Sequence, residues 1–135
     1  MRVLIADDSA VIVQRLVTML ADVDGIEIVG HAGTVAEASQ AVRTLTPDVV
    51  ILDLQMPGGS GIDVLESMKR DRVTPIVIVL TNYPHPQYRK KCLQSGARFF
   101  MDKSNEFERV AAALRRLIRD GSFEQEDSRG RSDRD

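Results

Sequence analysis

Five polar residues stand at or just beyond the ends of apolar runs in this sequence, and their types suit chemistry on a charged group. Together they offer three carboxylates, one hydroxyl and one ammonium. A cation and hydrogen-bond donors around a carboxylate can receive a phosphoryl group, whose outer oxygens need such partners as charge shifts onto them. An aspartate can itself attack phosphorus and form an acyl phosphate. The five residues are Asp7, Asp8, Asp53, Thr81 and Lys103.

The apolar run at residues 49–52 is the element around which the others are arranged, because it delivers Asp53 to its end. A short run without polar alternation is typical of a strand buried on both faces, as in a parallel sheet covered by helices. Pro57 and the glycine-rich stretch 58–61 cannot continue such a strand. In open α/β sheets, ligands bind outside the carboxyl ends of the strands, so Asp53 is placed where chemistry is expected.

The rest of the chain alternates between strand and helix patterns. Further apolar runs predict strands at 2–6, 26–29, 75–80 and 97–101. Helix starts are indicated by Ser9, by the capping-box pair Thr34 and Glu37, and by Ser104 or Asn105. Two more helices are expected over 62–72 and 87–95. Five strands alternating with five helices specify an α/β fold, a doubly wound parallel sheet with helices on both faces.

Composition favours one domain at residues 1–120, followed by a disordered tail or truncated linker at 121–135. The chain has 135 residues, is 43% hydrophobic and has a formal net charge of -2, so it has no general attraction to nucleic acid or to a membrane surface. The single cysteine, Cys92, forms no internal disulfide, and no apolar run approaches the roughly 20 residues that span a bilayer. Since the first strand pattern begins without a signal-peptide pattern, we expect a soluble cytoplasmic protein.

Three carboxylates at one sheet edge repel one another by ~3 kcal/mol per pair at ~5 Å and an effective dielectric of ~20. A divalent cation would offset this repulsion. Mg²⁺ is suited because it prefers hard oxygen ligands and keeps several waters. We therefore expect a magnesium site at this edge.

The spacing of these residues resembles the receiver domain of two-component response regulators, and in particular chemotaxis-regulator-like receivers. The pattern consists of Asp7-Asp8, Asp53-x-x-Met56-Pro57-x-x-x-Gly61, Thr81 and Phe100-x-x-Lys103. The resemblance covers residues 1 to about 120 and implies a flavodoxin-like sheet with strand order 2-1-3-4-5.

The resemblance also implies a role for each site residue. Asp53 matches the acceptor of a phosphoryl group from a histidine of a sensor kinase or phosphotransfer protein. Asp8, Asp53 and the backbone carbonyl of Gln55 match the Mg²⁺ ligands, and Asp7 matches the acid that holds the metal through water.

Three other matches concern the response to phosphorylation. Lys103 matches the lysine that pairs with the acidic site and then with a phosphoryl oxygen. Thr81 matches the hydroxyl that swings toward the phosphoryl group, and Phe100 matches the aromatic switch that turns inward, although Phe99 competes for that part. The added charge favours the arrangement that brings Thr81 and Lys103 closest. The output face would be the fourth helix, the fifth strand and the fifth helix.

The sequence departs from the family pattern after Lys103 and after Thr81. Ser104 replaces the usual proline, which puts the cis peptide bond common at that position in doubt. Asn82 stands where a small residue is common, and Gln55, Asn82 and Tyr83 border the phosphoryl group, where they influence its lifetime.

Other readings remain open for single residues and for the whole chain. Taken without the other site residues, Asp7-Asp8 would be interpreted as an acidic pair in a turn, and Asp53 as a surface acid at the end of a strand. His31 and His85 are expected in solvated loops, and Cys92 is expected to be a packed helix residue. The leading function is a stand-alone receiver that binds a downstream protein, with possible homodimerisation on phosphorylation. The alternative is the receiver of a DNA-binding regulator whose output domain, about 60 residues or more, is absent from this chain.

A third reading is a phosphoaspartyl hydrolase. Those enzymes place two acids one residue apart after the first strand, whereas Asp7 and Asp8 are adjacent. We therefore expect no enzyme beyond self-catalysed phosphorylation and dephosphorylation.

Overall fold

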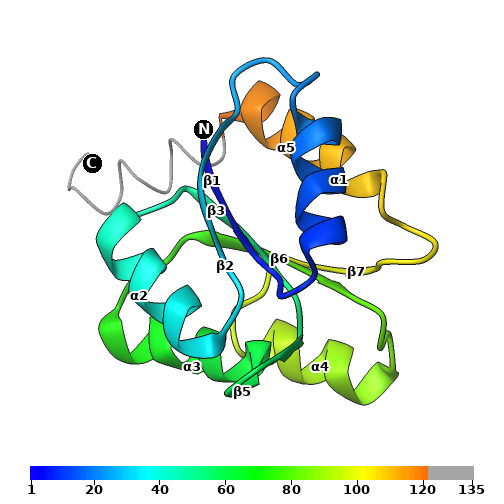
Figure 1. The fold of residues 1–135 in the computed structure, drawn as a ribbon. Helices are drawn as coiled ribbons and strands as arrows, with labels where there is room; N and C mark the ends of the chain where they lie inside the picture. The colour runs from blue at the N-terminus through cyan, green and yellow to red at the C-terminus, as the bar shows by residue number, and fades with distance from the viewer. Residues whose placement is uncertain (122–135) are drawn as a thin grey trace.

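The computed structural model describes residues 1–121, and the predicted tail from residue 122 onward lies outside the described residues. The chain alternates between strands and helices (Figure 1). The strands are β1 (Arg2–Ala6), β2 (Glu27–Ala32), β3 (Val49–Leu52), β4 (Gln55–Met56), β5 (Gly59–Ser60), β6 (Ile76–Thr81) and β7 (Phe99–Asp102). The helices are α1 (Ala10–Leu20), α2 (Val35–Leu45), α3 (Gly61–Asp71), α4 (Pro86–Gln94) and α5 (Arg109–Asp120).

The main sheet has five parallel strands in the order β2-β1-β3-β6-β7. Because β4 and β5 form a separate two-stranded hairpin, this order is the predicted 2-1-3-4-5, and the predicted fold class is confirmed. All four residues of the central strand β3 are buried, as its unbroken apolar run predicts.

Helices cover both faces of this sheet, with α1 and α5 on one face and α2, α3 and α4 on the other (Figure 1). Successive side chains of a strand point to opposite faces. In β1, Val3 and Ile5 pack with α1 and α5, whereas Leu4 and Ala6 pack in the other layer. Each inner strand therefore has to be apolar at every position.

The helix starts follow the predicted caps in part. The Ser9 hydroxyl accepts a hydrogen bond from the Ile12 N–H, and the Thr34 hydroxyl accepts one from the Glu37 N–H. The Glu37 carboxylate, however, accepts from the N–H of Gly33, so the predicted capping box at α2 is only half formed. A complete box that the sequence analysis missed forms at α3, between residues 60 and 63.

The predicted start of the last helix is wrong. Helix α5 begins at Arg109 and has no side-chain cap, because the Asp102 carboxylate accepts hydrogen bonds from the Ser104 N–H and the Asn105 side chain. These bonds hold residues 102–105 in a turn. Strand β7 also begins at Phe99, two residues later than expected, while β2 runs to Ala32 instead of residue 29.

No peptide bond between described residues is cis, so the bond after Lys103 is trans. Among residues 1–121, none of the helices has the length and apolar character to cross a membrane.

Candidate functional site

The predicted site residues lie at one edge of the sheet because each continues the hydrogen-bond ladder of its strand. The Asp7 N–H donates to the Ala32 carbonyl, and the Asp53 N–H donates to the Ala6 carbonyl, both at 2.9 Å. The Lys103 N–H donates to the carbonyl of Thr81 at 2.8 Å. These bonds extend the β1–β2, β1–β3 and β6–β7 pairs, and β3 pairs directly with β6, so the carboxyl ends of β1, β3, β6 and β7 form one platform.

Three carboxylates meet on this platform. Oxygens of Asp7, Asp8 and Asp53 all lie within 4.8 Å of one another, and neither His31 nor His85 joins this group. Asp7 and Asp53 are each 5% exposed, whereas Asp8 is open to solvent. The Asp7 carboxylate accepts from the Ser9 N–H at 2.9 Å.

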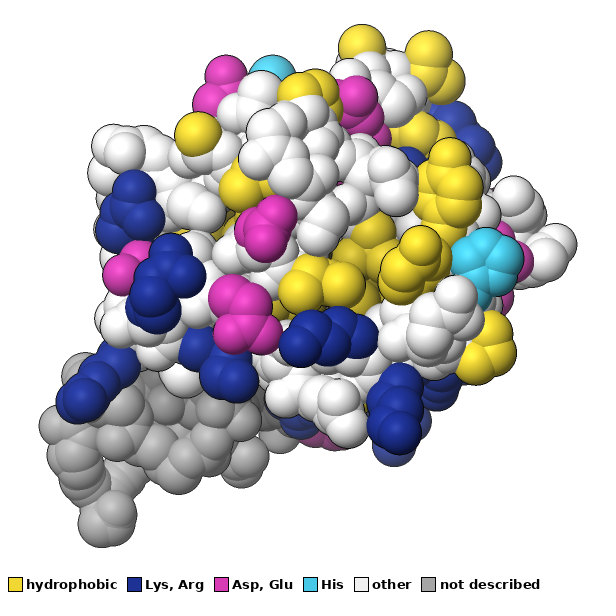
Figure 2. Space-filling view, turned by 90° about the horizontal axis from the view of Figure 1, so that it is seen from below, with side chains coloured by type: hydrophobic (Ala, Val, Ile, Leu, Met, Phe, Trp, Pro, Cys, Tyr) yellow, Lys and Arg dark blue, Asp and Glu magenta, His cyan; other side chains and the backbone are white. Residues whose placement is uncertain are grey.

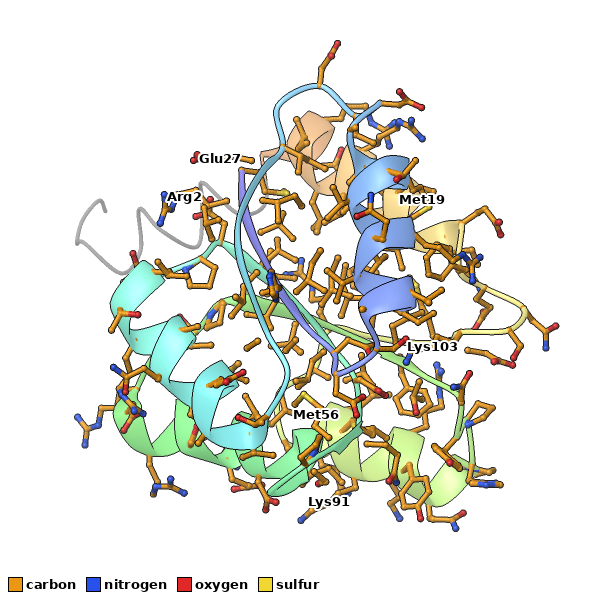
Figure 3. The ribbon with its side chains drawn as sticks, viewed as in Figure 1. Arg2, Met19, Glu27, Met56, Lys91 and Lys103 are labelled. Carbon is orange, nitrogen blue, oxygen red and sulfur yellow. The ribbon has the colours of Figure 1, made fainter. Side chains whose placement is uncertain are left out.

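The Lys103 ammonium lies between two of these acids. Its Nζ is 2.8 Å from Oδ2 of Asp7 and 3.1 Å from Oδ2 of Asp53. Figure 3 shows its side chain reaching from the β7 end of the sheet toward the end of β1. The bridge joins the ends of three strands, since Asp7 follows β1, Asp53 follows β3 and Lys103 follows β7.

Burial and neighbouring charges shift the pKa values of Asp53 and Lys103. Burial raises the pKa of Asp53 above its ordinary value, and the charge of Asp7 adds to this, while the Lys103 ammonium opposes it. Burial alone would lower the pKa of Lys103, but its hydrogen bond to Asp7 and the charge of Asp53 outweigh that effect and raise it. The lysine is therefore held in its charged form between two acids.

Gly61 permits the close approach of α3 to the phosphoacceptor candidate. Its N–H donates to the Leu54 carbonyl at 2.9 Å. A Cβ atom at this position would collide with the backbone carbonyl of Asp53 and would lie 3.2 Å from the Leu52 side chain. The glycine of the family-like pattern thus has a packing reason in this structure.

The Thr81 hydroxyl is buried beside the same edge. It accepts a hydrogen bond from the Tyr83 N–H at 3.0 Å, a contact that the sequence analysis missed. Because the backbone occupies its acceptor site, its own O–H proton remains available for donation. Its predicted role toward a phosphoryl group stays a prediction.

Gln55 and Phe100 take positions that suit their predicted roles without testing them. The Gln55 N–H donates to Oδ1 of Asp53 at 3.3 Å, while its side chain is exposed. The Phe100 side chain is 7% exposed and packs in the α4 layer, whereas Phe99 belongs to the α5 layer. Arg89 of α4 also donates to the Phe100 carbonyl at 3.3 Å, which the sequence did not indicate.

Cys92 is the buried anchor of α4, as predicted for a packed helix residue. Burial raises the pKa of its thiol to about 11, so the thiol is protonated at neutral pH.

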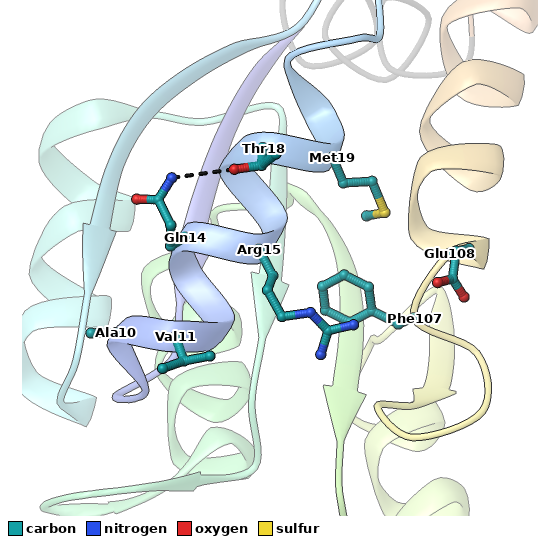
Figure 4. Close-up of a pocket in the computed structure, with 8 residues that line it drawn as sticks. All are labelled: Ala10, Val11, Gln14, Arg15, Thr18, Met19, Phe107 and Glu108. Carbon is teal, nitrogen blue, oxygen red and sulfur yellow. Dashed lines mark hydrogen bonds between the residues drawn. The ribbon is translucent and has the colours of Figure 1, made fainter.

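An open groove of about 780 Å³ borders the site where α1 begins (Figure 4). Val11 of α1 is one of its lining residues and is 69% exposed. The guanidinium of Arg15 lies over the Phe107 ring, 4.1 Å from its centroid, and forms one wall. Helix α1 starts three residues after Asp7, so the groove and the acidic platform are adjacent.

The residues at this platform suit a divalent cation. Three carboxylates and one ammonium leave a local formal charge of -2, and carboxylate oxygens are the hard ligands that Mg²⁺ prefers. Asp8 makes no hydrogen bond or ion pair with the rest of the described chain, and it is open to solvent from which a hydrated ion would arrive.

Comparison with known proteins places these features in one family. The sequence model of the response regulator receiver domain matches residues 3–115. Response regulator GacA from Pseudomonas viridiflava is 32% identical over 114 residues, which cover 84% of this chain and 53% of GacA. The DNA-binding transcriptional activator EvgA from Escherichia coli K12 is also 32% identical, over 84% of this chain and 55% of EvgA. The chain thus spans about half the length of the curated relatives it matches.

Solved structures agree with this assignment. The response regulator domain of Thermotoga maritima CheB superimposes with a TM-score of 0.78 and 28% identity, covering 89% of this chain and 94% of that domain. A chain from the CheX–CheY–BeF3–Mg²⁺ complex of Borrelia burgdorferi gives a TM-score of 0.72 and 30% identity, covering 84% of this chain and 88% of that one. The chain belongs to the response regulator receiver domain family of two-component systems.

Proposed function

We propose that this receiver accepts a phosphoryl group on Asp53 from a phosphohistidine of a sensor kinase or phosphotransfer protein. The observation that carries the proposal is the Lys103 ammonium held between Asp7 and Asp53. That geometry places a fixed positive charge beside an oxygen of the nucleophile. An incoming phosphoryl oxygen can take over a donor of the same ammonium.

The reaction exchanges one phosphorus bond for another. A carboxylate oxygen of Asp53 forms the new P–O bond while the P–N bond to the donor imidazole breaks. The electron pair of the broken bond leaves with the imidazole nitrogen. Lys103 and the Thr81 hydroxyl then donate to the phosphoryl oxygens, which carry the added charge.

A bound Mg²⁺ would neutralise charge on the transferring group. We assign Asp8, Asp53 and the Gln55 carbonyl as its direct ligands and Asp7 as a ligand through water. The proximity of the three carboxylates supports this assignment. The chain would catalyse its own phosphorylation and dephosphorylation and would have no separate metabolic substrate.

The histidine-bearing partner is proposed to cover the groove beside α1. The first turn of α1 follows the acidic pair Asp7-Asp8 after one residue, Ser9, so a donor bound at Asp53 would lie near it. Val11 offers an exposed apolar contact there, and Arg15 and Phe107 form the opposite wall. We therefore infer that Val11 contributes to partner affinity without taking part in the chemistry.

Phosphorylation is proposed to act on the α4, β7 and α5 side through Thr81 and Phe100. When the Thr81 hydroxyl turns toward the phosphoryl group, it leaves the Tyr83 N–H. Phe100 then repacks, and its carbonyl is tied to Arg89 of α4. A local change at the site would thereby reach the surface through these two hydrogen bonds.

Two outputs are compatible with this switch. A stand-alone receiver would bind a downstream protein. A second candidate, the receiver of a DNA-binding regulator, is supported by relatives of whose length this chain matches about half, one of which is described as a DNA-binding transcriptional activator.

Intact-mass spectrometry tests the proposed chemistry. Incubation with Mg²⁺ and acetyl phosphate should add one phosphoryl group to the wild type and none to Asp53→Asn. Asp71→Asn removes an exposed acid from α3 and serves as the matched control, which should be labelled like the wild type. Equal labelling of Asp53→Asn and the wild type would refute the assignment.

A further inference from the structure

Another cavity, of about 440 Å³, lies between the end of α3 and the end of α4. Helices that connect parallel strands run back across the sheet and end where the next strand begins. The cavity therefore lies at the amino edge of the sheet, opposite the acidic platform. We call it the α3–α4 cavity, and six of its lining residues define it: Leu65, Met68, Lys69, Arg72, Val77 and Ser95.

The interior of the α3–α4 cavity is apolar. Leu65, Met68 and Val77 are each 5% exposed or less and belong to the core of this layer. Val73, in the connection between α3 and β6, is half-buried and adds apolar surface. Figure 2 views the layer of α3 and α4 from outside and shows apolar side chains at the surface, with Lys and Arg side chains along one border of the apolar area. A ligand held here has to offer an apolar part.

The residues that end α4 form a fixed wall of this cavity. Ser95 is 4% exposed, and its hydroxyl donates to the Glu66 carboxylate of α3 at 2.9 Å. Gly96 follows it, and apart from its chain neighbours no heavy atom of the described chain lies within 4 Å of the place that a Cβ atom there would take. The cavity is thus preformed, as ligand pockets usually are, and its volume lies in their usual range of about 300–1,000 Å³.

Two cations line the exposed part of the cavity. Lys69 and Arg72 are three residues apart at the end of α3, so their side chains are neighbours, and both are exposed. Neither side chain has an ion pair or a hydrogen bond with another residue in 1–121. The acid between them in sequence, Asp71, pairs instead with Arg43 at 3.3 Å. Both positive charges are therefore available to a ligand.

The negative groups near the cavity leave its Arg72 end positive. Glu66 lies six residues before Arg72, about 9 Å along the helix axis, so its carboxylate belongs to the Ser95 end. The end of α3 carries roughly half a negative charge, and N–H groups of residues 72 and 73 already donate to its last carbonyls. Two full side-chain charges exceed that half charge.

This combination selects among classes of ligand. A metal ion would find no carboxylate, because none of the described residues that line the cavity is acidic. A bare inorganic anion would leave the apolar interior uncovered, and a cationic amphiphile would be repelled by Lys69 and Arg72. A small molecule with an apolar body and one anionic group satisfies both parts of the cavity.

We propose that the α3–α4 cavity binds a small, free amphiphilic anion, with its apolar chain over Leu65 and Val77 and its charged group at Lys69 and Arg72. Such a ligand contacts α3 and the residues that end α4, so its binding restrains α4, of which only Cys92 is buried. The inference is independent of the proposed function, because the cavity contains none of the residues that act on the phosphoryl group.

Amide NMR of the full, unphosphorylated chain without Mg²⁺ tests the inference, with octanoate as the probe. Octanoate should shift amides in 73–77 and 95–97 saturably and leave α1, beside the larger groove, unshifted. Lys69→Glu/Arg72→Glu should raise the Kd by about tenfold or more. The matched control Lys90→Glu/Arg115→Glu reverses two exposed cations outside the cavity that also have no ion pair within 1–121, and it should change the Kd by less than about twofold.

Two further probes separate the parts of the ligand. 1-Octanol keeps the chain but has no charge, and butanoate keeps the charge but has four fewer methylene groups. Each should bind at least about tenfold more weakly than octanoate. Saturating octanoate should also slow hydrogen exchange of the α4 amides by about threefold or more.

Several results would each overturn the inference. These are absence of saturable octanoate binding, shifts confined to α1, equal binding of octanoate and 1-octanol, equal binding by the two double variants, and α4 exchange that octanoate leaves unchanged. Cosedimentation with phosphatidylglycerol vesicles that Lys69→Glu/Arg72→Glu abolishes would identify a membrane surface as the ligand and would also overturn it. Labelling of Asp53 is measured separately by intact mass, so failure of the proposed function is distinguishable from failure of this site.

Discussion

The two connections that border the site differ in how firmly the chain holds them. Between β3 and α3, the Gly61 N–H bonds to the Leu54 carbonyl, the Pro57 carbonyl accepts from the Val35 N–H, and a complete capping box starts the helix. Five residues of α3 are buried. Between β6 and α4, residues 82–87 are all exposed, α4 begins without a side-chain cap, and Cys92 is its one buried residue.

This difference separates a firmly held connection, which begins after Asp53, from a loosely held connection, which begins after Thr81. A segment that has few buried apolar contacts and an exposed backbone unfolds locally at a low cost in free energy. The elements of a protein that change conformation are usually segments of this kind. The β3–α3 side holds Asp53 firmly, whereas the loosely held β6–α4 connection, which includes Tyr83, begins directly after Thr81, the buried last residue of β6. Lys103 joins the two sides, because its N–H donates to the Thr81 carbonyl and its ammonium contacts Asp53.

Removing the Lys103 ammonium, which links the two sides, should have the largest effect on the free energy of unfolding. Lys103→Met leaves Asp7 and Asp53 buried without their cation, and breaking a buried pair in this way typically costs about 3–5 kcal/mol. We expect a loss of this size in urea unfolding at neutral pH without Mg²⁺. Arg43→Met removes the exposed pair with Asp71 and should cost under about 1 kcal/mol. Similar losses for both variants would contradict the structural role of the bridge.

The second largest loss of stability is expected when a side chain is added at Gly61, on the β3–α3 side. Gly61→Ala forces a methyl group against the Asp53 carbonyl and should lower the free energy of unfolding by about 2–3 kcal/mol. Gly33→Ala adds a methyl group whose nearest neighbours are at ordinary contact distance, 3.7 Å and beyond. This control should change stability by under about 1 kcal/mol. If thermal unfolding shows the two variants to be equally stable, the close approach of α3 is not a constraint.

Native-state hydrogen exchange compares the two helices directly. Backbone amides in α4 should exchange at least about tenfold faster than those in α3, which corresponds to ~1.4 kcal/mol in opening free energy. The physical reason is the single buried anchor of α4. Equal protection of the two helices would show that the β6–α4 side is as rigid as the other.

Burial of Cys92, the anchor of α4, predicts a small loss of folding stability at alkaline pH. The thiol of Cys92 has its pKa raised from 9.0 to about 11, so between these values the unfolded chain loses a proton that the folded chain keeps. Stability therefore falls as pH rises through this window, by about 1 kcal/mol at pH 10. Cys92→Ala removes this contribution. The difference in unfolding free energy between the two proteins, measured from pH 8 to 11, should shrink accordingly, and a constant difference would speak against burial of the thiol.

The sheet was predictable because its signal is repeated at every position of a strand. In β3 and β6 every residue faces one helical layer or the other, so no polar residue interrupts either apolar run. The carboxyl-edge positions of Asp53 and Lys103 follow from that regularity. The short β4–β5 hairpin has only two residues per strand and leaves no periodic pattern to detect.

The errors arose where side chains compete for backbone groups. Ser104 and Asn105 are good caps in isolation, but the Asp102 carboxylate accepts from the Ser104 N–H and from the Asn105 side chain, and α5 begins only at Arg109. At α3 the third helical residue is Asp63 instead of the usual Glu or Gln, so the capping box gave no recognisable pattern. Contacts between distant segments, such as Arg89 with the Phe100 carbonyl, depend on packing that spacing does not encode.

The central claim is that Asp53 carries the phosphoryl group, and chemical trapping tests it most directly. After treatment with Mg²⁺ and acetyl phosphate, borohydride reduction should convert the acyl phosphate to homoserine, which peptide mass spectrometry can locate. We expect homoserine at residue 53 and aspartate at residues 7 and 8. Homoserine at residue 7 or 8, with residue 53 unchanged, would contradict it.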